Sequence, residues 1–230
     1  MIHEPDETTK GKSVSVRLQT LPFVPSDNRK RPLPPNGHLS QFILGQFPEG
    51  YRGYAIDVGA SDGISINTTY VLEIAHLWTV LSVEANPEFA QFLKSSRAFV
   101  EMCACSDHQG TATFHANQEN LEALSSLAPT DRADLIRDNA ANNKWQEFEV
   151  RVETVDSLMQ KWQFPQLDAL CIDTEGTELD VLKGCSLERW RPKVIVTECW
   201  DRVGPIDLYL EARNYKKTAR NAMNDVWILR

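Results

Sequence analysis

The sequence contains no long apolar run, and none of its segments approaches the ~20 consecutive apolar residues that a membrane-spanning helix needs. It also lacks the excess of Lys and Arg that nonspecific nucleic-acid binding requires, because its formal net charge is −8. The same negative charge argues against adsorption to anionic membranes. We therefore expect neither nucleic acid nor a membrane as a partner.

Cysteine is scarce, and its pattern excludes a disulfide framework. The five cysteines are odd in number and contain no Cys-x-x-Cys pair. We expect buried, reduced thiols, with a metal cluster as the weaker alternative. Residues 1–10 are acidic and polar, unlike a secretory signal. Both observations predict a cytoplasmic protein.

The length of 230 residues fits one domain with an appendage. Residues 1–36 are rich in proline and show no sustained periodicity, which predicts an extended N-terminal arm. Residues 37–230 form the predicted domain. Within it, the polar stretch 117–146 is interpreted as an insertion over the ligand site. The oligomeric state is not readable from the sequence.

Strand-like and helix-like patterns alternate along the predicted domain. This order is typical of an α/β fold with a mostly parallel sheet and helices on both faces. Predicted helices lie at 38–47, 66–77, 88–95, 155–162, 178–183 and 206–213. Predicted strands lie at 53–58, 79–84, 99–105, 111–115, 148–152, 167–173, 194–199, 215–219 and 226–229.

A glycine-rich turn follows the first of these strands. Its pattern is Asp-x-Gly-x-x-x-Gly, with Asp57, Gly59 and Gly63, and a helix is predicted to open at about Ser65. Glycines let the chain turn tightly and let a ligand approach the main chain. An acid just before the first glycine would repel a pyrophosphate, unlike the G-x-G-x-x-G dinucleotide pattern. The turn therefore predicts a cationic or zwitterionic adenosine ligand, and S-adenosylmethionine fits.

Acidic residues fall at or near the carboxyl ends of the predicted strands, where parallel sheets bind their ligands. Glu84 is placed to accept both ribose hydroxyls, and Asp57 to receive the cofactor's ammonium group. Asp173 and Glu175 follow a buried strand, and Glu198 closes the next one. Ser106 follows the third strand. One sheet edge should therefore gather Asp57, Glu84, Asp173 and Glu198.

The chain resembles the FkbM family of S-adenosylmethionine-dependent methyltransferases from about Tyr54 to its C-terminus. The matching segments are Ile56–Gly63, Val83–Pro87, Ala104–Asp107 with Gly110, Val155–Leu158, Ile172–Glu178, Val181–Gly184 and Pro192–Val194. The resemblance implies a class I methyltransferase-like, Rossmann-like fold, with a seven-stranded sheet whose last strand is antiparallel. It also implies O-methylation of a hydroxyl on a sugar, polyketide or other small metabolite.

Carried over by position, the resemblance implies a set of residues that line the cofactor. These are Asp57, Gly59, Ala60, Ser61, Gly63, Glu84, Ala85, Cys105, Ser106 and Asp173. The expected catalytic residue is Asp173, which would orient the acceptor hydroxyl or take its proton, with Glu175 and Glu198 as further candidates. We assign no metal, because the acids lack a histidine beside them, although a divalent cation on them is another activation route.

Two other functions stay open at this point. One is a nicotinamide-dependent oxidoreductase on a related sheet, against which the acid before Gly59 and the glycine spacing both argue. The other is a noncatalytic cofactor-binding module, against which the acids Asp173 and Glu175 argue.

Overall fold

The computed structural model describes residues 37–65, 67–117, 125–127, 145–199, 204–221 and 223–230. The predicted arm at 1–36 and most of the predicted insertion at 117–146 lie outside these residues. The chain divides into two compact units, and the second, Pro32–Arg230, contains every described residue.

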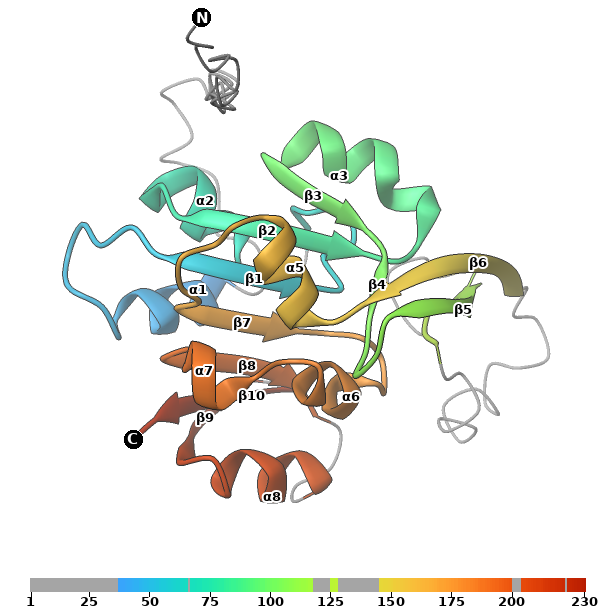
Figure 1. The fold of residues 1–230 in the computed structure, drawn as a ribbon. Helices are drawn as coiled ribbons and strands as arrows, with labels where there is room; N and C mark the ends of the chain where they lie inside the picture. The colour runs from blue at the N-terminus through green and yellow to red at the C-terminus, as the bar shows by residue number, and fades with distance from the viewer. Residues whose placement is uncertain (1–36, 66, 118–124, 128–144, 200–203, 222) are drawn as a thin grey trace, which may run out of the picture. The chain divides into compact units, whose positions relative to one another are not determined.

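A seven-stranded sheet forms the centre of this unit (Figure 1). Its order is β3-β2-β1-β7-β8-β10-β9, in which β3, β2, β1, β7 and β8 run parallel and β10 is antiparallel to both of its neighbours. The predicted mostly parallel sheet with an antiparallel last strand is confirmed. The strands are β1 (Tyr54–Val58), β2 (Thr79–Glu84), β3 (Phe99–Met102), β7 (Ala169–Ile172), β8 (Val194–Glu198), β9 (Tyr215–Asn221) and β10 (Asn224–Leu229).

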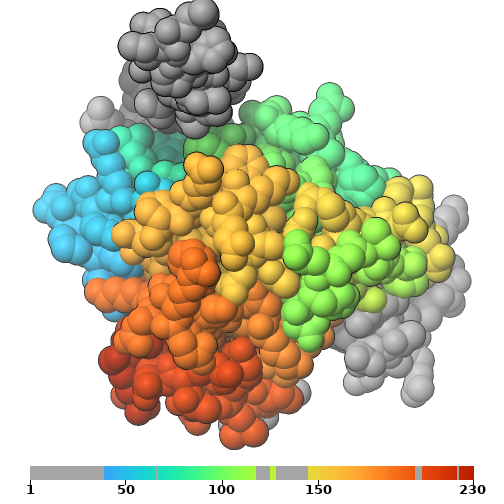
Figure 2. All heavy atoms as spheres, in the orientation of Figure 1, coloured from blue at the N-terminus to red at the C-terminus, as the bar shows by residue number. Residues whose placement is uncertain are grey.

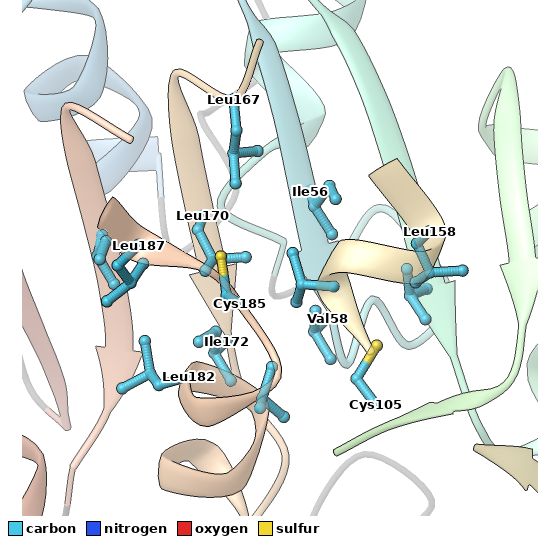
Figure 3. Close-up of a cluster of buried hydrophobic side chains, with 14 of the residues drawn as sticks. Ile56, Val58, Cys105, Leu158, Leu167, Leu170, Ile172, Leu182, Cys185 and Leu187 are labelled. Carbon is cyan, nitrogen blue, oxygen red and sulfur yellow. The ribbon is translucent and has the colours of Figure 1, made fainter. Parts of the chain in front are cut away.

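Both faces of the sheet are buried under helices, because neighbouring apolar residues on each central strand point to opposite sides. Ile56 and Leu170 pack with α5 (Val155–Lys161), α6 (Glu178–Lys183), α7 (Leu187–Trp190) and α8 (Pro205–Glu211) (Figure 3). Ala55 and Ala169 pack on the other face with α1 (Gly37–Leu44) and α2 (Tyr70–His76). Figure 2 shows α5, in yellow, and α6 and α7, in orange, closing over the first face.

A second, three-stranded sheet was not predicted. The sequence predicts one strand over 99–105, but the chain bends at Cys103 and divides into β3 and β4 (Ala104–Cys105). Cys103 and Cys105 pack into the main core, whereas Ala104 packs into a separate apolar cluster. β4 then pairs with β6 (Trp145–Glu153), which pairs with β5 (Gly110–Asn117), so the predicted edge strand 111–115 is part of a longer one.

The helix after the glycine turn begins later than the sequence predicts. It opens at Tyr70 instead of about Ser65. The side-chain oxygen of Asn67 accepts the backbone N–H groups of Thr69, at 3.0 Å, and of Tyr70, at 2.8 Å. Asparagine commonly satisfies backbone donors in this way outside a helix, which delays the first helical turn.

The other predicted helices agree with observed ones to within a few residues, whereas α7 was not predicted. The predicted helix at 88–95 is a 3₁₀ turn, η2 (Pro87–Phe89), followed by α3 (Ala90–Ser96). All five cysteines are buried and none of them forms a disulfide bond, as predicted. In the described part of the chain, no helix has the length and apolar character to cross a membrane.

Candidate active site

The glycine turn connects β1 to two neighbouring strands through its backbone. The N–H groups of Gly59 and Ala60 both donate to the Val83 carbonyl on β2, each at 3.0 Å. The Asp173 N–H donates to the Val58 carbonyl at 2.9 Å, which holds the end of β7 against the end of β1. Gly59 and Gly63 have φ angles of +84° and +80°, a left-handed region that favours glycine.

Glu84, at the end of β2, is the acid that holds this turn. Its Oε2 accepts the Ser61 N–H and its Oε1 accepts the Asn86 N–H, both at 2.7 Å. Burial raises the pKa of Glu84, and the charge of Asp57 adds to that rise, while the backbone N–H donors lower it. Each carboxylate oxygen has a second lone-pair direction, so Glu84 is able to accept a ligand hydroxyl as well.

Asp57, on β1, is buried among polar partners. Its Oδ2 accepts the Asn67 side-chain N–H and the Thr69 hydroxyl, both at 2.7 Å. The residue also lies on the wall of an open hollow at the carboxyl edge of the sheet. The hollow is lined by Asp57, Gly59, Asn67, Thr68, Cys171, Ile172, Asp173, Val196 and Asn224.

The three predicted catalytic acids are brought together by the ends of β7 and β8. One carboxylate oxygen from each of Asp173, Glu175 and Glu198 lies within 4.8 Å of the other two. Glu198 ends β8 and is buried, and its register partner on β10 is Asn224. Glu175 has a positive φ of 57°, so the loop is strongly curved where it presents this carboxylate.

Glu178 organises the loop that carries these acids. Its Oε1 accepts the backbone N–H groups of Thr174 and Gly176, both at 3.0 Å. The acid at the start of α6 therefore folds back over residues 174–176. This contact gives Glu178 a structural role, in line with its position in the first helical turn.

Cys105 and Ser106 lie at the start of the second sheet. The Cys105 side chain points into the main core (Figure 3). A hydrogen bond with the Cys103 thiol is the largest cause that raises the pKa of Cys105, and burial raises it as well. Any contact of Cys105 with a cofactor therefore has to come from its main chain. The Ser106 N–H donates to the Glu153 carbonyl at 3.0 Å, and Ala85 is half-buried beside the cluster of the second sheet.

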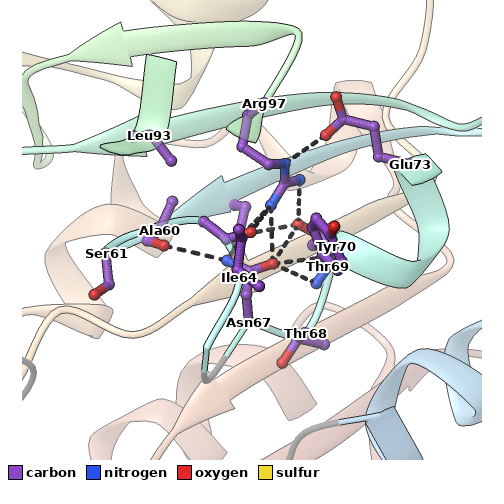
Figure 4. Close-up of polar contacts among 12 residues, drawn as sticks. Ala60, Ser61, Ile64, Asn67, Thr68, Thr69, Tyr70, Glu73, Leu93 and Arg97 are labelled. Atoms are coloured by element: carbon purple, nitrogen blue, oxygen red, sulfur yellow. Dashed lines mark hydrogen bonds and ion pairs between the residues drawn. The ribbon is translucent and has the colours of Figure 1, made fainter. Parts of the chain in front are cut away.

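The sequence reading missed a buried polar network beneath the turn. Arg97, at the end of α3, contacts Asn67, Thr69 and Glu73 (Figure 4). It also lies 3.8 Å from the Asp57 carboxylate. Glu73 and Arg97 stand 24 residues apart in the chain, and nothing in the local sequence pattern links them. The only available signal was an acid and an arginine at positions where a helix would otherwise bury apolar side chains.

Comparison with known proteins places these features in a family. The sequence matches the Methyltransferase FkbM domain over residues 57–217, which includes the glycine turn and the acid-rich loop. No curated protein matches the chain.

The fold is similar to that of a solved methyltransferase FkbM from Methylobacillus flagellatus KT. The TM-score is 0.54 at 16% identity, over 83% of this chain and 47% of that chain. This chain thus spans about half the length of that protein. More distant similarities are to a precorrin-6y C5,15-methyltransferase from Geobacter metallireducens GS-15 (TM-score 0.37, 14% identity, 83% of this chain and 85% of that one) and to a human methyltransferase 10 domain containing protein (TM-score 0.38, 9% identity, 83% and 77%).

With its glycine turn, its acid-bearing strand ends and a sheet of the class I methyltransferase type, this chain belongs to the FkbM methyltransferase family.

Proposed function

We propose that the protein is an S-adenosylmethionine-dependent methyltransferase that methylates a hydroxyl group on a small metabolite. The observation that carries this proposal is that Asp57, Gly59 and Asp173 line one hollow. The acid assigned to the cofactor and the acid assigned to the acceptor thus border the same space. The family assignment supports methyl transfer as the reaction.

The residues of the turn fit the proposed cofactor. A Cβ on Gly59 would lie 1.7 Å from the Asp173 carbonyl oxygen, so only glycine allows the main chains of the two loops to approach this closely. Glu84 is positioned by two backbone donors, and its remaining lone pairs suit the two ribose hydroxyls. Asp57 supplies negative charge for the ammonium group. Between the proposed positions of the ribose and the ammonium group, the cofactor would lie against the main chain of Gly59, Ala60, Ser61 and Gly63.

The chemistry that the bound cofactor supplies is an electrophilic methyl group. The protein's part is to place the acceptor oxygen in line with that methyl, and such alignment is worth roughly 7–11 kcal/mol of the barrier. Asp173 orients the acceptor hydroxyl or removes its proton. Glu175 and Glu198 assist from the same cluster. Three like charges this close repel one another, which favours a hydrogen-bond donor such as a substrate hydroxyl between them.

A described part of the insertion, residues 125–127, contacts the loop that carries the acids, which favours a role for the insertion in acceptor choice. The Ser126 hydroxyl donates to the Thr174 carbonyl at 3.2 Å, and Ser126 pairs with His115 on β5 through two backbone hydrogen bonds. Residues 125–127 therefore connect the second sheet to the loop of acids. We propose that acceptors bind beside residues 125–127 and are small hydroxylated molecules such as sugars or polyketides. We also propose that the protein is cytoplasmic.

Calorimetry with S-adenosylhomocysteine and NAD, followed by a methyl-donor consumption assay, tests the proposal. The expected results are binding of S-adenosylhomocysteine, no binding of NAD, and turnover with at least one member of a panel of hydroxylated acceptors. Binding of NAD alone would support the oxidoreductase. Binding of S-adenosylhomocysteine without turnover on any hydroxylated or amine acceptor would support the noncatalytic module. A chelator arm shows whether the acids at 173, 175 and 198 act through a divalent cation.

A further inference from the structure

Arg97 is the centre of a buried network that lies outside the set of residues assigned to the cofactor. Its side chain is fully buried. It donates to four partners, of which Glu73, Asn67 and Thr69 are labelled in Figure 4. Nε donates to Glu73 Oε2 at 2.5 Å, and Nη2 donates to the Thr69 hydroxyl at 2.8 Å. Nη1 donates to Asn67 Oδ1 at 3.0 Å and to the Gly63 carbonyl at 3.2 Å. One guanidinium therefore fixes three points of the segment 63–69.

The charges in this network are unevenly paired. Two buried carboxylates, Asp57 and Glu73, share the single cation Arg97. Glu73 makes the direct contact at 2.5 Å, whereas Asp57 Oδ2 is 3.8 Å from Nη1. Glu73 is held on its other side by the Ala98 N–H at 2.8 Å. Asp57 is instead satisfied by neutral donors, the Asn67 amide and the Thr69 hydroxyl.

The Thr69 hydroxyl connects the two parts of the network. It accepts a hydrogen bond from Arg97 Nη2, which leaves its own hydrogen for Asp57 Oδ2 at 2.7 Å. Arg97 thus reaches Asp57 by hydrogen bond only through this neutral hydroxyl, and its closer ion pair is with Glu73, at 2.5 Å against 3.8 Å for Asp57. At short range inside a protein, an ion pair is much stronger than the same pair in water. Because Arg97 pairs most closely with Glu73, the excess negative charge of the network lies on Asp57.

We propose that Glu73 and Arg97 are positioning residues for the cofactor's amino group: Glu73 holds the guanidinium so that Asp57 keeps its negative charge for the ammonium. This inference rests on the proposed function. Neither residue touches the hollow, and both act through Asp57 and the segment 63–69. Without the charge of Glu73, Arg97 keeps Asp57 as its one ion-pair partner among the described residues, and the ammonium meets a neutralised pair.

Two ligands separate this role from general support of the fold. S-adenosylhomocysteine carries the amino group, and 5′-methylthioadenosine has the same adenosine and sulfur without the amino-acid moiety. In the variant Glu73→Gln, calorimetry should show an affinity for S-adenosylhomocysteine about tenfold lower, and an affinity for 5′-methylthioadenosine within about twofold of the original. The variant is nearly isosteric and leaves one cation with one carboxylate, so no buried charge loses its partner of opposite sign.

Two further variants control the measurement. Glu73→Asp keeps the charge and should retain the original preference for S-adenosylhomocysteine over 5′-methylthioadenosine, even if its unfolding temperature falls. Glu101→Gln removes another buried, ion-paired glutamate outside the candidate site and should leave the preference unchanged.

The outcomes are distinct. If Glu73→Gln leaves the ratio of the affinities for S-adenosylhomocysteine and 5′-methylthioadenosine unchanged, whether or not both affinities fall, the positioning role is overturned. A lost preference in Glu73→Asp would also overturn it, which covers the case in which Glu73→Gln does not fold. If the unaltered protein fails to bind S-adenosylhomocysteine, it is the proposed function that fails.

Discussion

Gly59 and Asp173 approach each other so closely that no side chain fits between their main chains. A Cβ on Gly59 would lie 1.7 Å from the Asp173 carbonyl oxygen. The contact joins the turn after β1 to the loop after β7, which carry the proposed cofactor and acceptor acids. The distance between the two halves of the candidate site is therefore set by backbone contact.

Replacing this glycine should disrupt the site by steric clash as well as by backbone strain. Gly59→Ala has to accommodate both the φ of +84° and the clash with Asp173. Gly50→Ala is the matched control, since Gly50 has a φ of +76° and nothing within 4 Å of the added carbon. We expect the control to lose about 1–2 kcal/mol of unfolding free energy, and Gly59→Ala at least about 2 kcal/mol more. Thermal unfolding measures both, and equal losses would contradict the clash.

Gly184 is a second glycine that steric contact requires, here without backbone strain. Its φ is −75°, yet a Cβ would lie 2.1 Å from the Ser106 carbonyl oxygen. Gly184→Ala should therefore cost about 1–3 kcal/mol by overpacking. Gly110→Ala, with nothing within 4 Å, should be neutral or slightly stabilising. Chemical denaturation of the two variants checks the difference in sign, and stability equal to the original in Gly184→Ala would show that the helix moves freely away.

Glu84 should make cofactor binding sensitive to acid. Burial raises its pKa, so this carboxylate takes up a proton at a higher pH than an ordinary glutamate. The protonated form has fewer acceptor sites for ribose hydroxyls, and we expect the affinity for S-adenosylhomocysteine to fall as the pH drops through the raised pKa.

Acid unfolding through Glu84 does not explain such a fall. Because its pKa is raised on folding, its contribution to stability is full below its unfolded pKa and is lost as pH rises through the folded one. Calorimetry between pH 8 and pH 5, roughly spanning the range of a raised carboxyl pKa, measures the effect. Glu84→Gln should bind weakly with no such pH step, and a step that persists in this variant would belong to another group.

Asp173 should matter far more for turnover than for the affinity of the cofactor, although it is expected to line the cofactor near the methyl group. Because general acid–base assistance contributes about 10²–10⁴-fold, Asp173→Asn should lower kcat by about 100-fold or more. Its affinity for S-adenosylhomocysteine should change little. Asp180→Asn is the control, since the Asp180 side chain is 45% exposed and pairs with Lys183 at 2.8 Å on α6. Full turnover in Asp173→Asn with cofactor bound would remove this residue from the mechanism.

Glu101 should stabilise the fold at neutral pH without affecting the site. Burial alone would raise its pKa. The hydrogen bonds from Lys161 and Trp162 and the charges of Lys161 and Arg151 lower it by more, so the net shift of the pKa is downward. Glu101→Gln should therefore cost about 1–3 kcal/mol near pH 7. Since a lowered carboxyl pKa gives stability that is lost as pH falls through it, the difference from the original protein should shrink on acidification. Denaturant titrations at several pH values check this, and a constant difference would contradict it.

The sequence predicted the main sheet well because its buried strands are short, continuous and apolar. β2 and α6 have the predicted boundaries. The second sheet was missed because Phe99–Cys105 alternates like a single strand, and only tertiary packing shows that Ala104 belongs to a different core from Cys103 and Cys105. The short helix α7 carried too few residues for a periodic signal.

The acids at the strand ends could be predicted because parallel strands place their carboxyl ends on one edge. The network under the turn could not. Asn67 delays the helix through its side chain, and Arg97 reaches the turn from the end of α3, so neither follows from spacing along the chain. The roles of the site residues remain predictions that the experiments above address.

The bend at Cys103 has a consequence for how this family can diversify. β4, β5 and β6 form hydrogen-bond ladders only with one another among the described residues, and none of them extends the ladder of the seven-stranded sheet. A hairpin attached in this way can change in length or be exchanged for another while the strands that carry Asp57 and Glu84 keep their register. Changes of acceptor would then be confined to this second sheet, while the strands proposed to hold the methyl donor stay the same.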